Sequence, residues 1–258
     1  MQIHHECLSD VERYLSKREK IPLGDKEADF QNLLRCIRQV RELDCTTEIL
    51  EIGTGTGWFP ILCQLNGLSC KGLEISPQLV DCAKKIGESH GVRAAVELGN
   101  IEETDLGREQ YDVIIANFVF EHVQNWRLGL SRVYDALRPN GVLLFQSPNK
   151  FSVISGEFNK LPFYGWLPNP IRYRVRMLFH GRDIMKLGID FNQFTYFGLR
   201  KTFRRLGFRR MLDRVDLADR NAINSPVKRA VLWACDHSRV VRETVLLFFE
   251  VTSFVCVK

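Results

Sequence analysis

The residues best suited to chemistry lie in the segment Glu48–Trp58, which places an acid near the end of an apolar run and three alternate glycines directly after it. The acid is Glu51, and the glycines are Gly53, Gly55 and Gly57. Glycine adopts positive φ readily and has no side chain to keep a ligand away from the backbone. A helix that begins at such a loop also presents free N–H groups. The segment therefore predicts a turn that holds a nucleoside-like cofactor.

Two common nucleotide-binding patterns fail at this loop. The dinucleotide pattern GxGxxG requires its third glycine at the position of Trp58. The phosphate-loop pattern requires a Gly-Lys-Ser/Thr ending, which is absent from the loop. A pyrophosphate-binding site is therefore disfavoured, and a nicotinamide oxidoreductase is only a distant alternative.

Further candidate residues follow the next predicted strands. Glu74 ends the second strand, 17 residues after the last of these glycines, and a carboxylate there can accept hydrogen bonds from both ribose hydroxyls. Asn100 and Ile101 follow the third strand and offer a polar contact and an apolar surface to an adenine ring. Asn117 and Phe118 lie at the end of the fourth predicted strand. Because the carboxyl ends of parallel strands meet at one edge, these residues are expected to share one crevice.

With these motifs the chain resembles the class I S-adenosylmethionine-dependent methyltransferases, from about residue 30 to its end. The resemblance implies S-adenosyl-L-methionine as cofactor. It also implies a doubly wound, Rossmann-like α/β fold with a mostly parallel seven-stranded sheet of order 3-2-1-4-5-7-6, the last-named strand antiparallel. The acid and glycines of the loop would shape the part of the site that holds the methionine end of the cofactor. The acid at the end of the second strand would bind the ribose. The residues after the third strand would hold adenine, and those at the end of the fourth would line the site. In that order, the implied cofactor-binding residues are Glu51, Gly53, Gly55, Gly57, Glu74, Asn100, Ile101, Asn117 and Phe118.

Within this family the chain resembles the small-molecule O-methyltransferases of ubiquinone biosynthesis. The narrower resemblance is carried by Glu121-His122-Val123, by the turn 137–141, and by Ser147-Pro148-Asn149. Some of those relatives have a further acid three residues before the glutamate and use the set for a metal. This chain has Phe118 there, so no metal is expected. The fourth strand also lacks the Asn/Asp-Pro-Pro-aromatic motif of enzymes that methylate DNA amino groups.

His122 is the candidate catalytic residue. The pKa of an unperturbed histidine is about 6.5, so its imidazole can take a proton from a hydroxyl or phenol. The alternative is a structural histidine that orients the loop, with Glu121 as its partner. A base is optional, because the sulfonium is already an activated donor and alignment alone can supply ~7–11 kcal/mol.

The elements that position these residues follow from the apolar pattern, which predicts βαβ units from residue 47 onward. The predicted strands are 48–52, 70–75, 94–98, 112–117, 141–147, 208–216 and 251–257. The predicted helices are 58–65, 77–89, 126–137, 196–206 and 226–237. Residues 1–46 are expected to form N-terminal helices packed on the core, from the Ser9–Glu12 capping box and the helical spacing of apolar residues from Phe30 to Val40. Residues 47–258 form the expected methyltransferase domain.

The segment 148–193 breaks the pattern and predicts a long, aromatic and basic insertion. Residues 150–210 contain 13 Lys and Arg against three Asp and Glu. One interpretation is a solvated basic face. Another is a lid over an acceptor pocket, in which Phe163, Tyr164 and Trp166 form apolar walls and the cations meet an anionic substrate or lipid surface. Nucleic-acid binding is disfavoured, because no RNA-binding module is visible.

Composition favours a folded, cytoplasmic protein. The 258 residues are 45% hydrophobic and 26% charged, and no apolar run has the ~20 residues of a membrane-spanning helix. The start of the chain lacks an export signal. The eight cysteines form no CxxC pair and are expected to be reduced thiols, and the sequence specifies no oligomeric state.

The predicted function is methyl transfer from S-adenosyl-L-methionine to a small-molecule or lipid-linked acceptor, most simply an oxygen atom. The protein would then act in the cytoplasm or as a peripheral protein at an anionic membrane. Two alternatives remain open: an RNA-modifying methyltransferase, and a non-catalytic module that binds S-adenosylmethionine.

Overall fold

A seven-stranded sheet organises the chain, with the order β3-β2-β1-β4-β5-β7-β6. The computed structural model describes residues 22–154, 161–180 and 192–258. Its strands are β1 (Glu48–Ile52), β2 (Ser69–Glu74), β3 (Val96–Leu98), β4 (Tyr111–Asn117), β5 (Leu137–Pro148), β6 (Arg210–Asp213) and β7 (Val251–Val257). Its α-helices are α2 (Glu27–Arg38), α3 (Trp58–Leu65), α4 (Pro77–Ser89), α5 (Trp126–Ala136), α6 (Asn169–His180), α7 (Tyr196–Leu206), α8 (Pro226–His237) and α9 (Arg239–Phe248).

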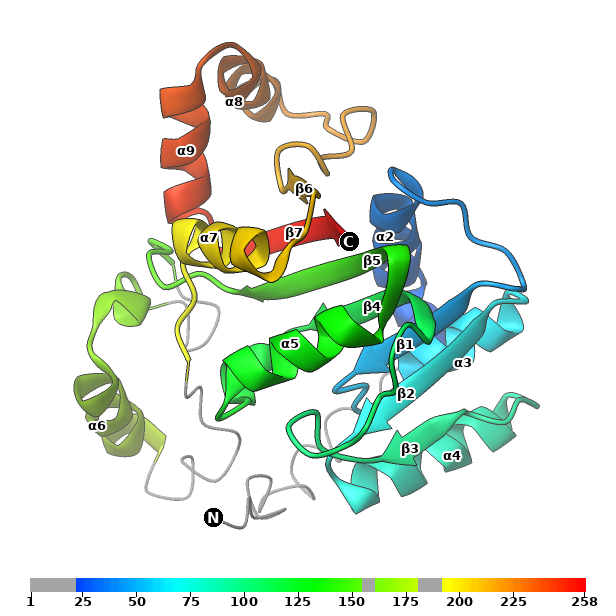
Figure 1. Cartoon of the computed structure of the whole chain (residues 1–258). Coiled ribbons are helices and arrows are strands. Elements are labelled where there is room, and N and C mark those ends of the chain that lie inside the picture. The colour runs from blue at the N-terminus through cyan, green and yellow to red at the C-terminus, as the bar shows by residue number, and fades with distance from the viewer. Residues whose placement is uncertain (1–21, 155–160, 181–191) are drawn as a thin grey trace.

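The predicted strand order is confirmed, and one detail of direction is wrong. The strands β1 to β5 pair in parallel. The antiparallel strand is β7, which runs opposite to both of its neighbours, whereas the last-named strand, β6, runs with the others. The edge strand β6 follows the common direction because α7 returns the chain after β5, and α8 and α9 then connect β6 to the antiparallel β7 (Figure 1).

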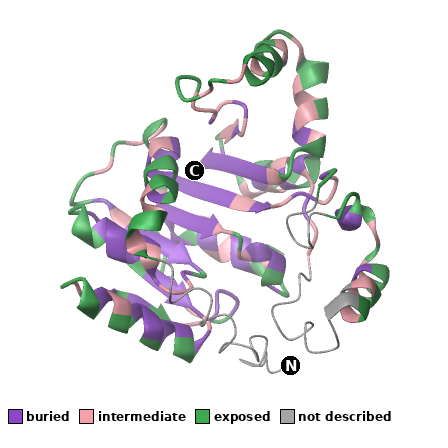
Figure 2. Cartoon of the chain, turned by 180° about the vertical axis from the view of Figure 1, so that it is seen from behind, coloured by how far each residue is buried: buried purple, intermediate pink, exposed green. Residues whose placement is uncertain are grey.

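Two apolar layers cover the sheet, one on each face, and the strands between them are largely buried (Figure 2). Side chains alternate along each strand, which assigns each residue to one layer. In β4, Val113 and Ile115 join the cluster that includes α2 and α3. Ile114 and Ala116 join the opposite cluster, with α5, α7 and the buried side of α9. The central strands are buried on both faces, which is why they read in the sequence as continuous apolar runs.

Most predicted boundaries agree with the structure to within two residues. The strand expected over 208–216 is shorter, because the Asp213 side chain accepts from the backbone N–H of Val215 at 3.0 Å and turns the chain. The strand expected over 141–147 begins earlier, and its pairing with β4 is irregular where Asn140 has a φ of +61°. The Ser9–Glu12 capping box lies outside the described residues.

Two helices were not predicted. Ser238 lies directly before α9, and its hydroxyl caps the first turn of the helix by accepting a hydrogen bond from the N–H of Val241. The helix α6 and the short 3-10 helix η4 (Tyr164–Trp166) lie within the insertion 148–193. In that insertion Arg172 is fully buried, with its guanidinium 5.4 Å from the centre of the Tyr164 ring, so it belongs to no basic surface. Among the described residues, no helix is long and apolar enough to cross a bilayer.

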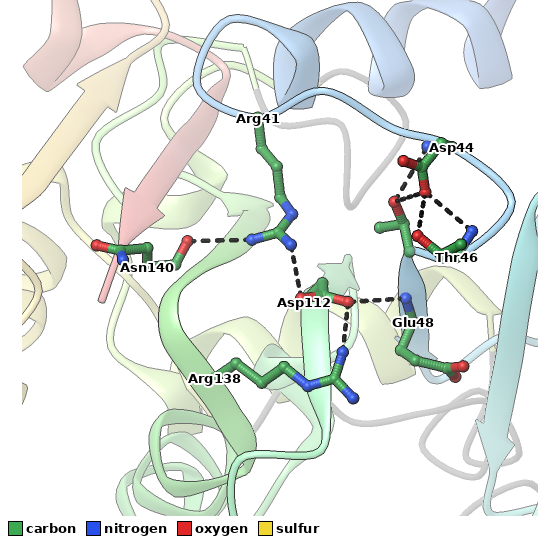
Figure 3. A network of polar contacts seen from close by, with 8 residues as sticks. Arg41, Asp44, Thr46, Glu48, Asp112, Arg138 and Asn140 are labelled. Carbon is green, nitrogen blue, oxygen red and sulfur yellow. Dashed lines mark hydrogen bonds and ion pairs between the residues drawn. The ribbon is translucent and has the colours of Figure 1, made fainter.

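A polar network fixes the end of the sheet opposite the glycine loop (Figure 3). The buried Asp112 carboxylate accepts from Arg41 at 2.6 Å, from Arg138 at 2.7 Å and from the backbone N–H of Glu48 at 3.0 Å. The network ties the segment after α2 to β1, β4 and β5. It thereby sets the register of the two central strands whose opposite ends carry the candidate site.

We expect Asp112→Asn to lower the free energy of unfolding by about 2 kcal/mol, since hydrogen bonds to a charged group contribute ~1.5–3 kcal/mol and the amide weakens two of them. Asp81→Asn, on the exposed side of α4, is the control and should change stability by less than about 0.5 kcal/mol. Urea unfolding measures both. Equal effects of the two substitutions would contradict a structural role for the Asp112 network.

Candidate cofactor site

A cavity of about 700 Å³ opens where β1 and β4 end. Its walls come from the loop after β1, the ends of β4 and β5, the beginning of α2 with the preceding 3-10 helix η2 (Leu23–Lys26), and the last turn of α4. The lining residues are Pro22, Leu23, Gly24, Lys26, Asp29, Asn32, Leu33, Glu51, Gly53, Thr54, Gly55, Thr56, Trp58, Ile86, Ser89, His90, Asn117, Phe118 and Gln146.

The glycine loop has the backbone that the sequence predicted. Gly53, Gly55 and Gly57 have φ values of +66°, +58° and +72°. A Cβ at Gly53 would also overlap the side chain of Val119, and one at Gly57 would lie 2.6 Å from the Cβ of Ala83. Glycine is therefore required at both ends of the loop by conformation and by space.

Glu51 places a carboxyl group at the inner wall of the cavity. Its side chain is buried and accepts a hydrogen bond from the Thr54 hydroxyl. Burial raises the pKa of Glu51 to about 8, an effect that the Thr54 hydrogen bond opposes and the nearby Glu74 carboxylate increases. At neutral pH the group is thus largely a neutral acid, and a cation bound beside it would favour its ionised form.

Glu74 holds the glycine loop from behind. Its Oε2 accepts from the N–H of Gly55 at 2.7 Å, and its Oε1 accepts from the N–H of Ser76 at 3.1 Å. Burial raises the pKa of Glu74, and these two backbone N–H groups act in the opposite direction. A backbone hydrogen bond from Ile75 acts in the same direction on the pKa of Glu74. The carboxylate therefore fixes the position of Gly55.

Asn117 and Phe118 form the wall at the end of β4. Phe118 has a φ of +54°, and its N–H donates to the backbone oxygen of Gln146 at 3.0 Å. The Oδ1 atom of Asn117 is buried and accepts no hydrogen bond within the described part of the chain. A buried acceptor without a donor costs about 1–3 kcal/mol, so it marks a position where a ligand N–H or O–H would fit.

The structure brings five of the implied cofactor-binding residues to the cavity wall: Glu51, Gly53, Gly55, Asn117 and Phe118. The others lie elsewhere. Gly57 and Glu74 support the loop from behind. The side chain of Asn100 accepts from the N–H of Glu102 at 2.9 Å, and Ile101 packs in the core. His122 is exposed at the end of the 3-10 helix η3 (Phe120–His122), and the buried carboxylate of Glu121 accepts from Ser147 at 3.2 Å.

Several residues of the cavity wall were not identified from the sequence. Thr54 could have been found, because a hydroxyl three residues after an acid in a tight loop can bond to it. Lys26 ends η2, and Asp29 and Asn32 lie on α2; all three precede the loop by more than twenty residues, and no motif marks them. Gln146 lies on the neighbouring strand, and only the pairing of β4 with β5 brings it to Phe118.

The residues present fit S-adenosyl-L-methionine. The cavity falls within the ~300–1,000 Å³ of small-molecule sites. A buried carboxyl group suits the cationic end of the ligand, the open glycine loop admits a ligand to the backbone, and the Asn117 oxygen can accept from its amino group. Within residues 22–154, 161–180 and 192–258, no cluster of three or more His, Cys, Asp or Glu has the arrangement of a metal site.

We expect Asn117→Ala to weaken S-adenosylmethionine binding about fivefold. The variant loses one neutral hydrogen bond to the ligand, and a loss of ~1 kcal/mol raises the Kd by about that factor. The same substitution should leave the ligand-free protein equally stable or up to about 1 kcal/mol more stable, because it removes a buried acceptor that has no partner. Calorimetric titration and urea unfolding measure the two effects. A loss of stability without a loss of affinity would assign Asn117 to the core rather than to the site.

Comparison with known proteins identifies the family of this fold. A family model described as a methyltransferase domain matches residues 2–220. A malonyl-[acyl-carrier protein] O-methyltransferase of Halalkalibacterium halodurans is 29% identical over 162 residues, which cover 57% of this chain and 59% of that protein. A ubiquinone biosynthesis O-methyltransferase of Rickettsia conorii is 26% identical over 151 residues, which cover 58% of this chain and 48% of that protein. The chain thus spans about half the length of these curated relatives.

Solved structures agree with the fold. A SAM-dependent methyltransferase from Archaeoglobus fulgidus superposes with a TM-score of 0.55 at 17% identity, covering 90% of this chain and 94% of that one. A Haemonchus contortus phosphoethanolamine N-methyltransferase 2, in complex with S-adenosyl-L-methionine, gives a TM-score of 0.55 at 16% identity and covers 88% of this chain and 52% of that one. The resemblance and the fold predicted from the motifs are confirmed. Because the family model covers most of the chain, the protein belongs to the family of methyltransferase domains.

Proposed function

We propose that the protein transfers the methyl group of S-adenosyl-L-methionine to an oxygen atom of a small-molecule or lipid-linked acceptor. One observation carries the cofactor half of the proposal. A single cavity joins the positive-φ glycine loop, the buried Glu51 carboxyl and the Asn117 oxygen, which accepts no hydrogen bond from residues 22–154, 161–180 and 192–258. The oxygen acceptor is supported by the relatives, two of which are named O-methyltransferases.

In this proposal the main role of the protein is to position the cofactor and the acceptor relative to each other. Gly53 and Gly55 let the ligand reach the backbone, Glu51 and Asn117 hold its amino acid end, and Glu74 holds the loop while offering oxygens to the ribose. Asn100 and Ile101 would hold adenine at the far side. The sulfonium supplies an activated methyl group, so aligning the acceptor for in-line attack is the principal task of the protein.

We expect His122 to accept the proton of the acceptor hydroxyl. It lies exposed in the turn that follows β4, four residues after Phe118 of the cavity wall, and histidine is the side chain that most often serves as a general base. His122→Ala should lower kcat about a hundredfold or more, within the ~10²–10⁴ range of general-base catalysis, with little change in S-adenosylmethionine affinity. The rising limb of the kcat–pH profile should disappear. An unchanged profile would make His122 a structural residue.

The insertion 148–193 supplies the proposed acceptor wall. Phe163 and Trp166 are about half exposed, with ring centroids 5.2 Å apart, and Trp166 stacks on Phe248 at the end of α9 at 5.9 Å. These rings would meet the apolar part of an acceptor. Tyr164, the third expected wall residue, is fully buried, and its hydroxyl donates to the backbone oxygen of Arg172 at 3.1 Å.

A peripheral contact with an anionic membrane is part of the proposal. The excess of basic residues over 150–210 supports it, as do the exposed aromatic rings beside them. We propose a reducing, cytoplasmic location, which the free thiols of the described cysteines support. Sedimentation with phosphatidylglycerol vesicles tests the contact, which high salt should reverse.

The decisive experiment is transfer of a radiolabelled methyl group from S-adenosylmethionine into a fractionated cell extract. We expect label in a hydroxyl- or carboxyl-bearing small molecule or lipid, and much less label with the Glu74→Ala variant at a cofactor concentration below saturation. Label in RNA would identify an RNA-modifying enzyme. Binding of the cofactor without labelling of any fraction would identify a non-catalytic module.

A further inference from the structure

A second hollow, of about 500 Å³, is lined by residues of α7 and α9, which contact each other beyond the β5 and β7 strands, with α9 at a steep angle to α7 (Figure 1). It shares no lining residue with the cofactor cavity. Its walls are five cations, one acid and one aromatic ring, namely Arg200, Lys201, Arg204, Arg205, Arg239, Glu243 and Phe197. The hollow is thus a concave site with a strong excess of positive charge.

The single acid of the hollow neutralises only part of this charge. Glu243 accepts from the Nε of Arg239 at 2.9 Å, and Arg200 lies 3.6 Å from the same carboxylate oxygen. In the part of the chain that the structure describes, the side chains of Lys201, Arg204 and Arg205 have no hydrogen-bond or ion-pair partner. Three cations therefore face the hollow with no counter-charge from the protein.

Helix formation does not explain this arrangement. Arg200 and Arg204 are four residues apart on α7, as are Lys201 and Arg205, and like charges at that spacing destabilise a helix. The two arginines in the last turn of α7 suit the negative end of its dipole. Arg239, however, lies in the first turn of α9, where the positive end of the dipole disfavours a cation and favours an anion.

We propose that this hollow binds a phosphate group. Arginine guanidinium groups match phosphate oxygens with paired N–H donors, and lysine adds a point charge. The concave shape distinguishes the site from a flat, solvated basic face, because a bound anion can meet cations from both helices at once. Phe197 is 42% exposed at the rim and provides an apolar surface for the rest of the molecule that bears the phosphate group.

The surroundings favour the headgroup of an anionic lipid over free phosphate as the source. Next to Arg239, Val240 is 75% exposed and Val241 is 37% exposed, so α9 presents an apolar surface at the edge of the hollow. Such a surface can enter the interface of a bilayer while the cations meet the headgroups. Only this choice of source rests on the membrane contact of the proposed function, and the phosphate site itself does not.

The test compares two triple variants of the full-length protein. The site variant is Lys201→Gln/Arg204→Gln/Arg205→Gln. The control is Lys71→Gln/Lys84→Gln/Lys85→Gln, which removes three exposed cations from β2 and α4 and changes the net charge equally. Each is titrated with inorganic pyrophosphate by calorimetry and sedimented with phosphatidylcholine vesicles, with and without phosphatidylglycerol. S-adenosylmethionine binding to each variant reports whether the fold and the cofactor site persist.

We expect the site variant to bind pyrophosphate at least about tenfold more weakly than the unsubstituted protein, and the control to stay within about twofold. Loss of vesicle binding in the site variant alone identifies a lipid headgroup as the source. Pyrophosphate binding without vesicle binding identifies a soluble phosphate. Equal losses in the two variants, or no binding of either probe by the unsubstituted protein, would overturn the proposal. If the triple variant does not fold, Lys201→Gln alone should weaken pyrophosphate binding about threefold.

Discussion

Replacing Glu74 with alanine is expected to weaken S-adenosylmethionine binding at least tenfold. The carboxylate accepts from the N–H groups of Gly55 and Ser76, and charge-assisted hydrogen bonds of this kind contribute about 1.5–3 kcal/mol each. Removing it leaves the glycine loop without its anchor and, in the proposed site, the ribose without its acceptor. The two losses act on the same affinity, so the effect should exceed that of any single ligand contact.

Two controls separate anchoring from ribose binding. Glu97→Ala, at an exposed position on the neighbouring β3, should leave the affinity within about twofold. Glu74→Gln keeps one acceptor oxygen for the loop and should bind more tightly than Glu74→Ala. Calorimetry with S-adenosylmethionine and with methionine alone completes the test. A decrease that is equal for both ligands assigns Glu74 to the loop, and an unchanged affinity for S-adenosylmethionine would refute its role in the site.

Replacing Glu51 with glutamine is expected to stabilise the ligand-free protein and to weaken cofactor binding. Because burial raises the pKa of Glu51 to about 8, the folded protein binds a proton that the unfolded chain, with a glutamate pKa near 4.3, releases at neutral pH. Stability therefore falls as pH rises between these two values. Removing the titration should raise the free energy of unfolding at pH 7 by on the order of 3 kcal/mol.

The pH dependence distinguishes this effect from ordinary repacking. The stability gain of Glu51→Gln should vanish near pH 4, increase up to about pH 8, and stay constant above it. Glutamine keeps an oxygen for the Thr54 hydroxyl, so the local packing is preserved. Cofactor affinity should fall at least about tenfold, because the variant has no anion to form beside the cationic ligand. A gain that is independent of pH would contradict the titration of Glu51.

The proton balance of binding offers a second measurement. Calorimetric titrations in buffers of different ionisation enthalpy measure the protons released when S-adenosylmethionine binds. At neutral pH the unsubstituted protein should release more protons per bound ligand than the Glu51→Gln variant. Equal proton release by the two proteins would mean that Glu51 stays neutral when the ligand is bound.

The sequence by itself determined the elements whose limits are set by local chemistry. The helices α3, α4, α7 and α8 were predicted with their observed limits. In α4 and α8 a capping serine followed by proline starts the helix, and Gly207, in the left-handed conformation, ends α7. Local signals also fixed the glycine loop, since the need for positive φ is a property of each residue and its neighbours.

The tertiary structure alone decided which of these residues share an environment. The sequence identified Glu51 as an acid in a loop, but its raised pKa depends on burial and on Glu74, which belongs to another strand. The Asn117 oxygen accepts no hydrogen bond from the described residues, which depends on how β4 ends within the sheet. Likewise, the sequence alone is compatible with a solvated basic face on α7. In the structure α9, a helix that was not predicted, adds Arg239, and the two helices together form a hollow. Burial, charge coupling and shape arise between segments distant in sequence, and no local pattern encodes them.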